Sequence, residues 1–159
     1  MDSTTTIGLL KITSIALPLA LSGYSFSASH INVTNLYNLP LSKSAPIFAT
    51  VFRQGGKLMV PAVLVAASSS SYLAYTLTAQ RALWAATGVF PFAILPFTSV
   101  VMIPGINRVL KVADSSEADR ELYTQDEYRE LMRKWVGQNY VRALLLFAGG
   151  MVGLVGTLL

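Results

Sequence analysis

Residues 82–106, ALWAATGVFPFAILPFTSVVMIPGI, carry no charged side chain. The stretch is longer than the roughly 20 apolar residues with which a helix crosses a bilayer. Further apolar stretches cover residues 12–29, 58–77 and 143–159. In the whole chain 53% of the residues are hydrophobic and 13% are charged, whereas about 25% are charged in soluble domains. The sequence therefore predicts an integral membrane protein with four helices.

The expected fold is all-α: a single domain, residues 1–159, that forms a four-helix transmembrane bundle. Pro46 suits the first turn of the second helix, where the missing N–H of proline is not needed. The connections are too short to form a separate catalytic domain, so an active site would lie inside the bundle or at its ends. The helices are expected at about residues 6–29, 45–78, 82–107 and 135–159.

Prolines and glycines indicate where these helices depart from regular α-helical geometry and where they pack closely against one another. Pro91 and Pro96 predict a kink or local unwinding in the third helix. Gly149, Gly153 and Gly156 in the fourth are typical of membrane helices that approach each other closely. Helix packing is therefore a better explanation of the glycines than ligand binding.

The polar segment between the third and fourth helices has a helical pattern from about Ser115. Leu122, Tyr128, Leu131 and Met132 would form one apolar face, as in a helix that lies at the membrane interface. A solvated connector explains the same composition. We therefore expect a polar, partly helical loop.

The contents of cysteine and histidine exclude several kinds of site. The chain has no cysteine, which excludes disulfides, thiolate metal sites and a cysteine nucleophile. His30 is the only histidine, so a metal would need amide, carboxylate or backbone ligands beside it. A metal is therefore disfavoured. Nucleic acid is not an expected partner, because Lys and Arg alternate with acids in one segment and form no basic stripe.

The first apolar stretch has a competing interpretation as a secretory signal peptide, because small residues that resemble a cleavage site follow it. Signal peptides begin with a basic region. Here Asp2 precedes the stretch, and the first basic residue is Lys11. These residues favour a membrane helix.

The distribution of Lys and Arg predicts the orientation in the membrane. The first and third connections, with the helix ends beside them, hold most of these residues, whereas only Arg81 lies between the second and third helices. By the positive-inside rule, the first and third connections are cytoplasmic and both termini are lumenal. We expect an integral membrane protein of the endoplasmic reticulum or another endomembrane.

A glycosylation assay tests this orientation. An acceptor site engineered between Gln80 and Arg81 should be modified in microsomes, whereas Asn32, which begins a natural acceptor sequence, should stay unmodified. The measurement is a shift in electrophoretic mobility that a glycosidase reverses. Modification at Asn32 would overturn the orientation.

An antiparallel bundle brings polar residues from four separate segments to one membrane face, because alternate helix ends meet there. Basic residues at such positions also serve as anchors in the headgroup region, which is the competing explanation. The polar residues at these helix ends include His30, Arg53, Asn107, Arg108, Asn139 and Arg142.

Arg142 is the strongest candidate for a ligand contact, because it lies inside the fourth apolar stretch. Ionisable groups at such positions usually face the bundle interior or a cavity. Trp135, Asn139 and Arg142 follow at spacings of four and three, so they share one helix face. This face suits a flat aromatic ligand that carries oxygen or negative charge. A structural contact between Arg142 and the third helix is the alternative.

Two longer motifs add a resemblance to a known family. They are PFTSVVMIPGINRVL at residues 96–110 and RKWVGQNYVRALLLFAGGMVGL at residues 133–154. Together they resemble the paired signature of the fungal anthrone oxygenases, small four-helix membrane proteins of polyketide pathways. Related bacterial proteins of unknown activity share the pattern. By position, the resemblance points to Pro96, Pro104, Asn107, Arg108, Trp135, Asn139 and Arg142.

The resemblance implies oxidation of an anthrone-type aromatic polyketide to an anthraquinone by molecular oxygen, without an added organic cofactor. Removing a proton from the acidic CH2 of an anthrone gives an electron-rich anion that can pass an electron to oxygen. Arg108 or Arg142 could stabilise the oxyanion, because a fixed cation acts strongly in a low-dielectric cavity. His30 is the expected base, since its ordinary pKa of about 6.5 suits proton transfer near neutrality. Arg53, Asn107, Trp135 and Asn139 are expected to bind substrate.

Two other functions compete with the oxygenase. The chain could be a non-catalytic scaffold or subunit that holds pathway enzymes through its third connection. A small transporter is disfavoured, because the apolar stretches contain no carboxylate for proton coupling. The lipid bilayer is an expected partner, and a homo-oligomer is left open.

Overall fold

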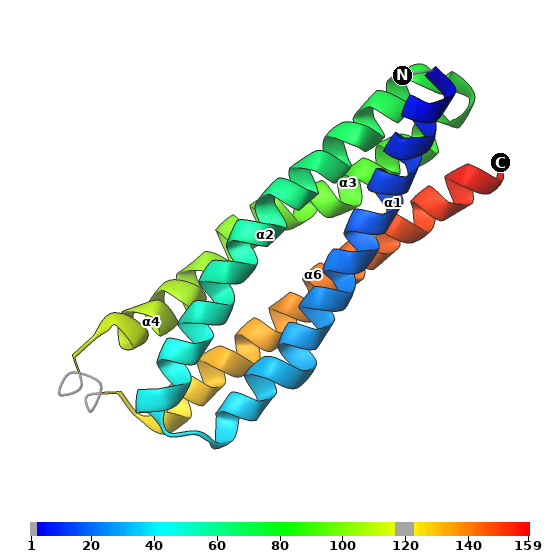
Figure 1. Ribbon diagram of the computed structural model, residues 1–159. Coiled ribbons are helices and arrows are strands. Elements are labelled where there is room, and N and C mark those ends of the chain that lie inside the picture. Colours follow the sequence, from blue (N-terminus) through cyan, green and yellow to red (C-terminus); the bar gives the residue numbers. More distant parts are fainter. Residues whose placement is uncertain (1–2, 117–122) are drawn as a thin grey trace.

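The computed structural model describes residues 3–116 and 123–159 (Figure 1). Four long helical segments run antiparallel, and each is long and apolar enough to cross a membrane. Among the described residues there is no strand. The predicted all-α transmembrane bundle is confirmed.

In chain order the elements are α1 (Ser3–Ser27), the π turn η1 (Ala28–Val33), the 3-10 turn η2 (Thr34–Asn38), α2 (Leu41–Thr76), η3 (Thr78–Gln80), α3 (Arg81–Phe97), the π turn η4 (Thr98–Met102), α4 (Ile103–Asp114) and α6 (Gln125–Leu158).

Each helix has two neighbours in the bundle. The first segment packs beside α2 and α6, and α3 packs beside the same two helices. In Figure 1 the η2–α2 connection, the end of α4 and the start of α6 lie at one end, whereas the start of α1, η3 and the end of α6 lie at the other. The structure thus brings together the helix ends that the sequence placed at one membrane face.

Two helices begin earlier than the sequence indicated. α2 begins at Leu41, so Pro46 lies inside the helix rather than in its first turn. α6 begins at Gln125, ten residues before the expected start near residue 135, and its N-cap is Thr124. The first part of the helical pattern that was expected from about Ser115 falls on residues 117–122, which lie outside the described residues. The Thr124 side chain accepts a hydrogen bond from the Glu127 N–H at 3.3 Å, and the Glu127 carboxylate accepts one from the Thr124 N–H. This capping box satisfies two backbone donors at the helix start.

Three of the four residues that were expected on the apolar face of an interfacial helix belong instead to α6. Tyr128, Leu131 and Met132 belong to the first turns of α6, and Tyr128 and Met132 are buried against the bundle. Leu122 lies outside the described residues. The apolar face detected in the sequence is thus, for these three residues, part of the fourth long helix.

Gln125 links the starts of α2 and α6. Its side-chain oxygen accepts a hydrogen bond from the Leu41 N–H at 2.9 Å, and its side-chain nitrogen donates to the Leu39 carbonyl at 3.0 Å. A backbone N–H at the start of a helix lacks a partner within the helix. The amide of Gln125 supplies that partner and holds two chain segments together at this end of the bundle.

The predicted local unwinding of the third helix occurs as the π turn η4, which begins two residues after Pro96. Pro104 has no N–H to donate to the carbonyl four residues earlier, so an ordinary α-helical ladder cannot continue through it. Instead the Ile103 N–H donates to the Thr98 carbonyl five residues back. The widened turn lets the segment continue into α4.

Glycines on α6 mark the closest helix contacts. A Cβ at Gly149 would lie 2.7 Å from Cδ of Pro91 in α3, and a Cβ at Gly150 would lie 2.5 Å from Cγ of Leu19 in α1. A Cβ at Gly153 would lie 2.8 Å from Ile15. A larger residue would have to push neighbouring helices apart. The interpretation of the glycines as packing positions is therefore confirmed for Gly149 and Gly153.

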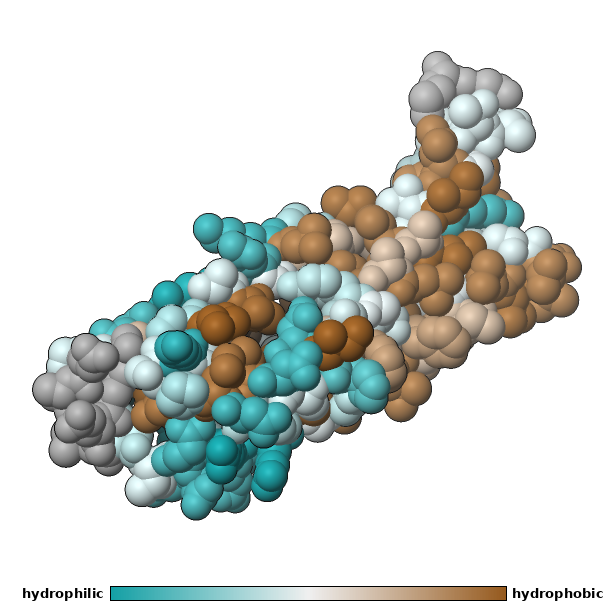
Figure 2. All heavy atoms as spheres, turned by 60° about the horizontal axis from the view of Figure 1, so that its bottom comes forward, coloured by the Kyte–Doolittle hydropathy of each residue, from teal (hydrophilic) through white to brown (hydrophobic). Residues whose placement is uncertain are grey.

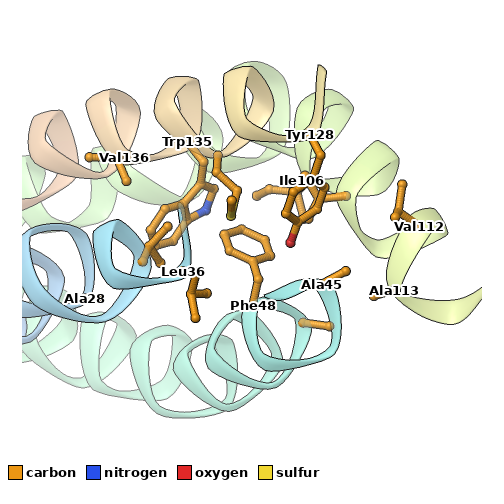
Figure 3. Packing of buried hydrophobic residues seen from close by; sticks show 14 of the residues in the cluster. Ala28, Leu36, Ala45, Phe48, Ile106, Val112, Ala113, Tyr128, Trp135 and Val136 are labelled. Atoms are coloured by element: carbon orange, nitrogen blue, oxygen red, sulfur yellow. The ribbon is translucent and has the colours of Figure 1, made fainter. Parts of the chain in front are cut away.

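The core consists of three apolar clusters along the bundle. The largest lies at the connection end and includes Phe48, Ile106, Tyr128 and Trp135 (Figure 3). A middle cluster contains Met59, Val63 and Ile94, and a third surrounds Leu73 and Trp84 at the opposite end. The space between the first two clusters is incompletely filled, and the candidate site lies there.

The outer surface agrees with a membrane location. Hydrophilic residues gather at the connection end in Figure 2, and apolar residues cover much of the visible remainder. Exposed apolar side chains occur along every long helix, among them Ile12, Leu64, Phe92 and Leu144. Because the surrounding lipid is apolar, such exposure is what a spanning bundle requires. The protein is an integral membrane protein.

Candidate active site

A cavity of about 390 Å³ lies within the bundle, between the connection-end cluster and the middle cluster. All four helical segments contribute to its walls. Its volume is within the roughly 300–1,000 Å³ of ligand pockets in proteins. Most of the wall is apolar; the polar or titratable side chains that line it are Tyr24, Ser25, Thr98, Ser99, Trp135, Asn139 and Arg142.

Arg142 lines this cavity and is 7% exposed. Among the described residues it makes no ion pair, and its Nε atom has no hydrogen-bond partner. Removing a charge from water without pairing it costs several kcal/mol. A buried cation of this kind therefore favours the binding of an anionic or oxygen-bearing ligand in the cavity.

Asn139 lies one turn before Arg142, and its hydrogen bonds hold the end of the first helical segment against α6 beside the cavity. Its side-chain nitrogen donates to the Ser25 carbonyl at 2.8 Å and to Oγ of Ser29 at 2.9 Å. Ser22 adds a hydrogen bond in the other direction, from its hydroxyl to the Ala143 carbonyl at 2.8 Å. These bonds join α1 to α6 beside the cavity and limit how far the guanidinium of Arg142 can move with its helix.

Trp135 is one of the aromatic side chains that line the cavity. Its ring meets Phe48 edge to face, with the ring centroids 5.1 Å apart (Figure 3). The indole N–H has no hydrogen-bond partner among the described residues. Indole N–H groups usually find an acceptor when they are buried. Two buried donors beside the cavity, the Trp135 N–H and the Arg142 Nε–H, thus have no acceptor among the described residues.

The other predicted site residues lie elsewhere. His30 is exposed and does not line the cavity; its Nδ1 lies 3.3 Å from the Tyr140 hydroxyl, and its ring stacks on Phe26. Arg53 binds the Asp114 carboxylate at 2.7 and 2.9 Å. Of the predicted set, the structure brings Trp135, Asn139 and Arg142 together at the cavity.

Arg108 and Asn107 are exposed on α4. Arg108 lines a second, more polar pocket of about 530 Å³, together with Lys111 and Lys134. The expected convergence with Arg142 does not occur, because the buried face of α4 is formed by Ile106 and Val109.

Sequence reasoning missed Tyr24 and the glycine pair Gly55–Gly56, which line the cavity from α1 and α2. A Cβ at position 55 would lie 2.9 Å from the Tyr24 hydroxyl oxygen, so glycine at this position leaves room for that hydroxyl. The sequence around Tyr24 carries only a weak indication of a role in a site. A tyrosine near the end of an apolar helix is also common as an interfacial anchor.

No group of three His, Cys, Asp or Glu side chains that could hold a metal ion occurs in residues 3–116 and 123–159. The cavity walls likewise contain none of these four residue types. The chemistry available from the walls is therefore that of hydroxyl, phenol, indole, amide and guanidinium groups.

These features define a class: a membrane-embedded four-helix bundle with an internal, largely apolar cavity and an unpaired cation in its wall. The family model described as anthrone oxygenase matches residues 48–152. An anthrone oxygenase from Claviceps purpurea (strain 20.1) is 29% identical over 153 residues, which are 92% of this chain and 87% of that protein. No solved structure matches the chain. The chain belongs to the anthrone oxygenase family.

The positions of Arg108 and His30 predict small effects of their removal. Arg108→Ala and His30→Ala should each retain at least about half of the wild-type turnover of an anthrone, because neither side chain lines the cavity and exposed charges interact weakly with distant groups. The measurement is quinone formation by purified, folded variants. A loss of two orders of magnitude in either variant would restore the role first expected from the sequence.

Proposed function

We propose that this chain is a membrane oxygenase that oxidises an anthrone-type aromatic polyketide to the anthraquinone with molecular oxygen. One oxygen atom becomes the new ketone oxygen, and the other leaves as water with the two hydrogens of the substrate CH2. Membership of the anthrone oxygenase family supports the reaction class. The observation that carries the site is the buried Arg142, which lines the cavity without an ion-pair partner among the described residues.

The walls suit a flat aromatic ligand. Phe52, Met59 and Ile94 supply apolar surface, and Trp135 supplies an aromatic one. The Arg142 guanidinium would bind an oxygen atom of the ligand. A ligand pocket typically combines such apolar walls with a small number of polar groups that fix orientation.

The proposed reaction requires two contributions from the protein, removal of a proton from the substrate and stabilisation of the resulting negative charge. Loss of one CH2 proton gives an anion whose charge is spread over the rings and the ketone oxygen. Arg142 would stabilise that oxyanion, and its effect is large because the walls of the cavity are mostly apolar. The resulting electron-rich anion can then pass an electron to oxygen without an added organic cofactor.

The cavity also opens toward the outer surface of the bundle. Val60 of α2 and Ser99 of η4 line the cavity and are exposed. Their exposed neighbours Leu64 and Val100 are apolar. An apolar substrate and oxygen both dissolve in the hydrocarbon region, so a membrane location favours the encounter of the two reactants.

An oxygen-dependent assay tests the proposed function. Purified protein in detergent is mixed with 1,8-dihydroxyanthrone in air-saturated buffer, and the absorbance of the quinone is followed. The initial rate should rise in proportion to protein and exceed the rate without protein. Equal rates with and without protein would contradict an enzymatic role and favour the scaffold.

A further inference from the structure

We propose that Gly56 determines the size of the substrate that reaches the cavity, because it keeps open an entrance between α2 and the π turn η4. The assignment rests on the proposed function and extends it to the choice between narrow and wide anthrones. The entrance is the place where the cavity meets the outer surface of the bundle, at the exposed residues Val60 and Ser99.

The first cause of the entrance is the irregular course of the third helical segment. α2 packs along α3 and along α4, but much less on the π turn that joins these two helices. Within this turn the Ile103 N–H donates to the Thr98 carbonyl five residues back, so the turn is wider than an α-helical one. Thr98, Ser99 and Ile103 all line the cavity. The wall between α2 and η4 is therefore the open side of the cavity.

The second cause is the absence of a side chain at one position of α2. Gly56 lines the cavity, and a Cβ at this position would meet no atom within 4 Å. Gly55 differs from it, because a Cβ at position 55 would lie 2.9 Å from the Tyr24 hydroxyl oxygen. Gly55 is thus a packing position, whereas Gly56 borders space that no neighbouring side chain fills.

Helical spacing places Gly56 on the side of α2 that faces the entrance. Gly56 and Val60 are four residues apart, so they are neighbours on one helix face. Both line the cavity, and Val60 is exposed on the outer surface. Met59, which also lines the cavity, is buried in the middle cluster and marks the inner side of the same helix. A side chain at position 56 would therefore project into the entrance.

The shape of the substrate makes this position sensitive. An anthrone has three fused rings and is rigid, so it cannot bend around a side chain that projects into its path. In an apolar pocket, one methylene more or less changes selectivity by about 10–200-fold. The free space at position 56 should therefore set an upper limit to the width of the ring system that the cavity admits from the bilayer.

Gly56→Leu tests the assignment, because it fills the entrance without a clash inside the protein. Its kcat/KM for 1,8-dihydroxyanthrone should fall at least about tenfold, whereas its thermal stability should not fall, since leucine favours a helix over glycine. Gly137→Leu is the matched control. A Cβ at position 137 also meets no atom within 4 Å, and Gly137 does not line the cavity. The control should keep the wild-type rate.

Gly56→Cys makes the obstruction reversible, because the natural chain contains no cysteine. The purified variant is treated with methyl or benzyl methanethiosulfonate, separated from excess reagent and assayed. Turnover should fall more after attachment of the benzyl group than after attachment of the methyl group, and a reducing agent should restore it. Treated wild-type protein and treated Gly137→Cys should keep their rates. Comparison of one protein before and after modification separates obstruction from misfolding.

Substrate width distinguishes selection by size from a general loss of activity. Gly56→Ala should lose more kcat/KM for a ring-alkylated 1,8-dihydroxyanthrone than for the parent compound. Equal losses for the two substrates would overturn the role in size selection. Wild-type rates for Gly56→Leu and for benzyl-modified Gly56→Cys would overturn the assignment and leave the proposed function intact. Absence of turnover in the wild-type protein would instead overturn the proposed function and, with it, this assignment.

Discussion

Arg142→Ala should reduce kcat/KM for an anthrone by about 10²–10³, equivalent to about 2.7–4 kcal/mol of transition-state stabilisation. The guanidinium lines a cavity with mostly apolar walls, where a fixed positive charge stabilises a developing oxyanion far more than it would in water. Arg142→Gln should show a similar loss, because it keeps much of the volume but not the charge. The measurement is the initial rate of quinone formation at several substrate concentrations.

Arg133→Ala serves as the matched control, because Arg133 is an exposed arginine on the same helix that does not line the cavity. It should keep the wild-type kcat/KM. Wild-type rates for folded Arg142→Ala and Arg142→Gln would remove the oxyanion role from this residue.

Asn139→Asp should inhibit the enzyme without changing the size of the side chain. The new carboxylate would lie three residues before Arg142 on the same face of α6, where side chains are neighbours. It would pair with the guanidinium and repel an anionic ligand, and like charges held together cost several kcal/mol. It would also lose the two hydrogen bonds that the amide nitrogen donates to Ser25 and Ser29. We expect kcat/KM to fall at least about tenfold.

Gln138→Glu adds the same charge one position away and is the control for Asn139→Asp. Gln138 does not line the cavity and donates instead to the Val101 carbonyl. If both variants lose activity equally, a general effect of negative charge on α6 explains the result, and the specific role of Asn139 beside Arg142 is wrong.

The membrane fold could be predicted from the sequence because lipid imposes one strong requirement. Every spanning backbone group needs an internal hydrogen bond, so long apolar stretches must form helices. The helix starts at the connection end could not be predicted as well. Gln125 forms hydrogen bonds with Leu39 and Leu41, more than 80 residues earlier in the chain. No local sequence pattern predicts such a contact.

The part of the site on α6 followed from helical spacing alone. Trp135, Asn139 and Arg142 share a face, and that face lines the cavity. The sequence placed Arg53 and Arg108 near helix ends, but a position along the chain does not determine the direction in which a side chain points. Arg53 turns instead to Asp114, which supplies an opposite charge from another helix.

Irregular turns account for the remaining differences. His30 lies in the π turn η1, where the rotation per residue differs from that of an α-helix. Its side chain therefore cannot be placed by counting from α1, and it lies on the outer surface beside Phe26 and Tyr140. Tyr24 precedes this turn and lines the cavity. Its relation to Gly55 depends on the packing of α1 against α2, which the sequence does not encode locally.

An anaerobic titration of bound substrate tests the central claim, that Arg142 stabilises the substrate oxyanion inside the cavity. Under argon no oxidation occurs, so the absorbance of the ionised anthrone can be followed against pH with and without protein. The pKa of the bound anthrone should lie about one to three units below that of the free anthrone, the usual effect of a nearby opposite charge, and Arg142→Gln should abolish the shift. An anthrone that titrates identically when free, bound to wild type and bound to Arg142→Gln would contradict the account.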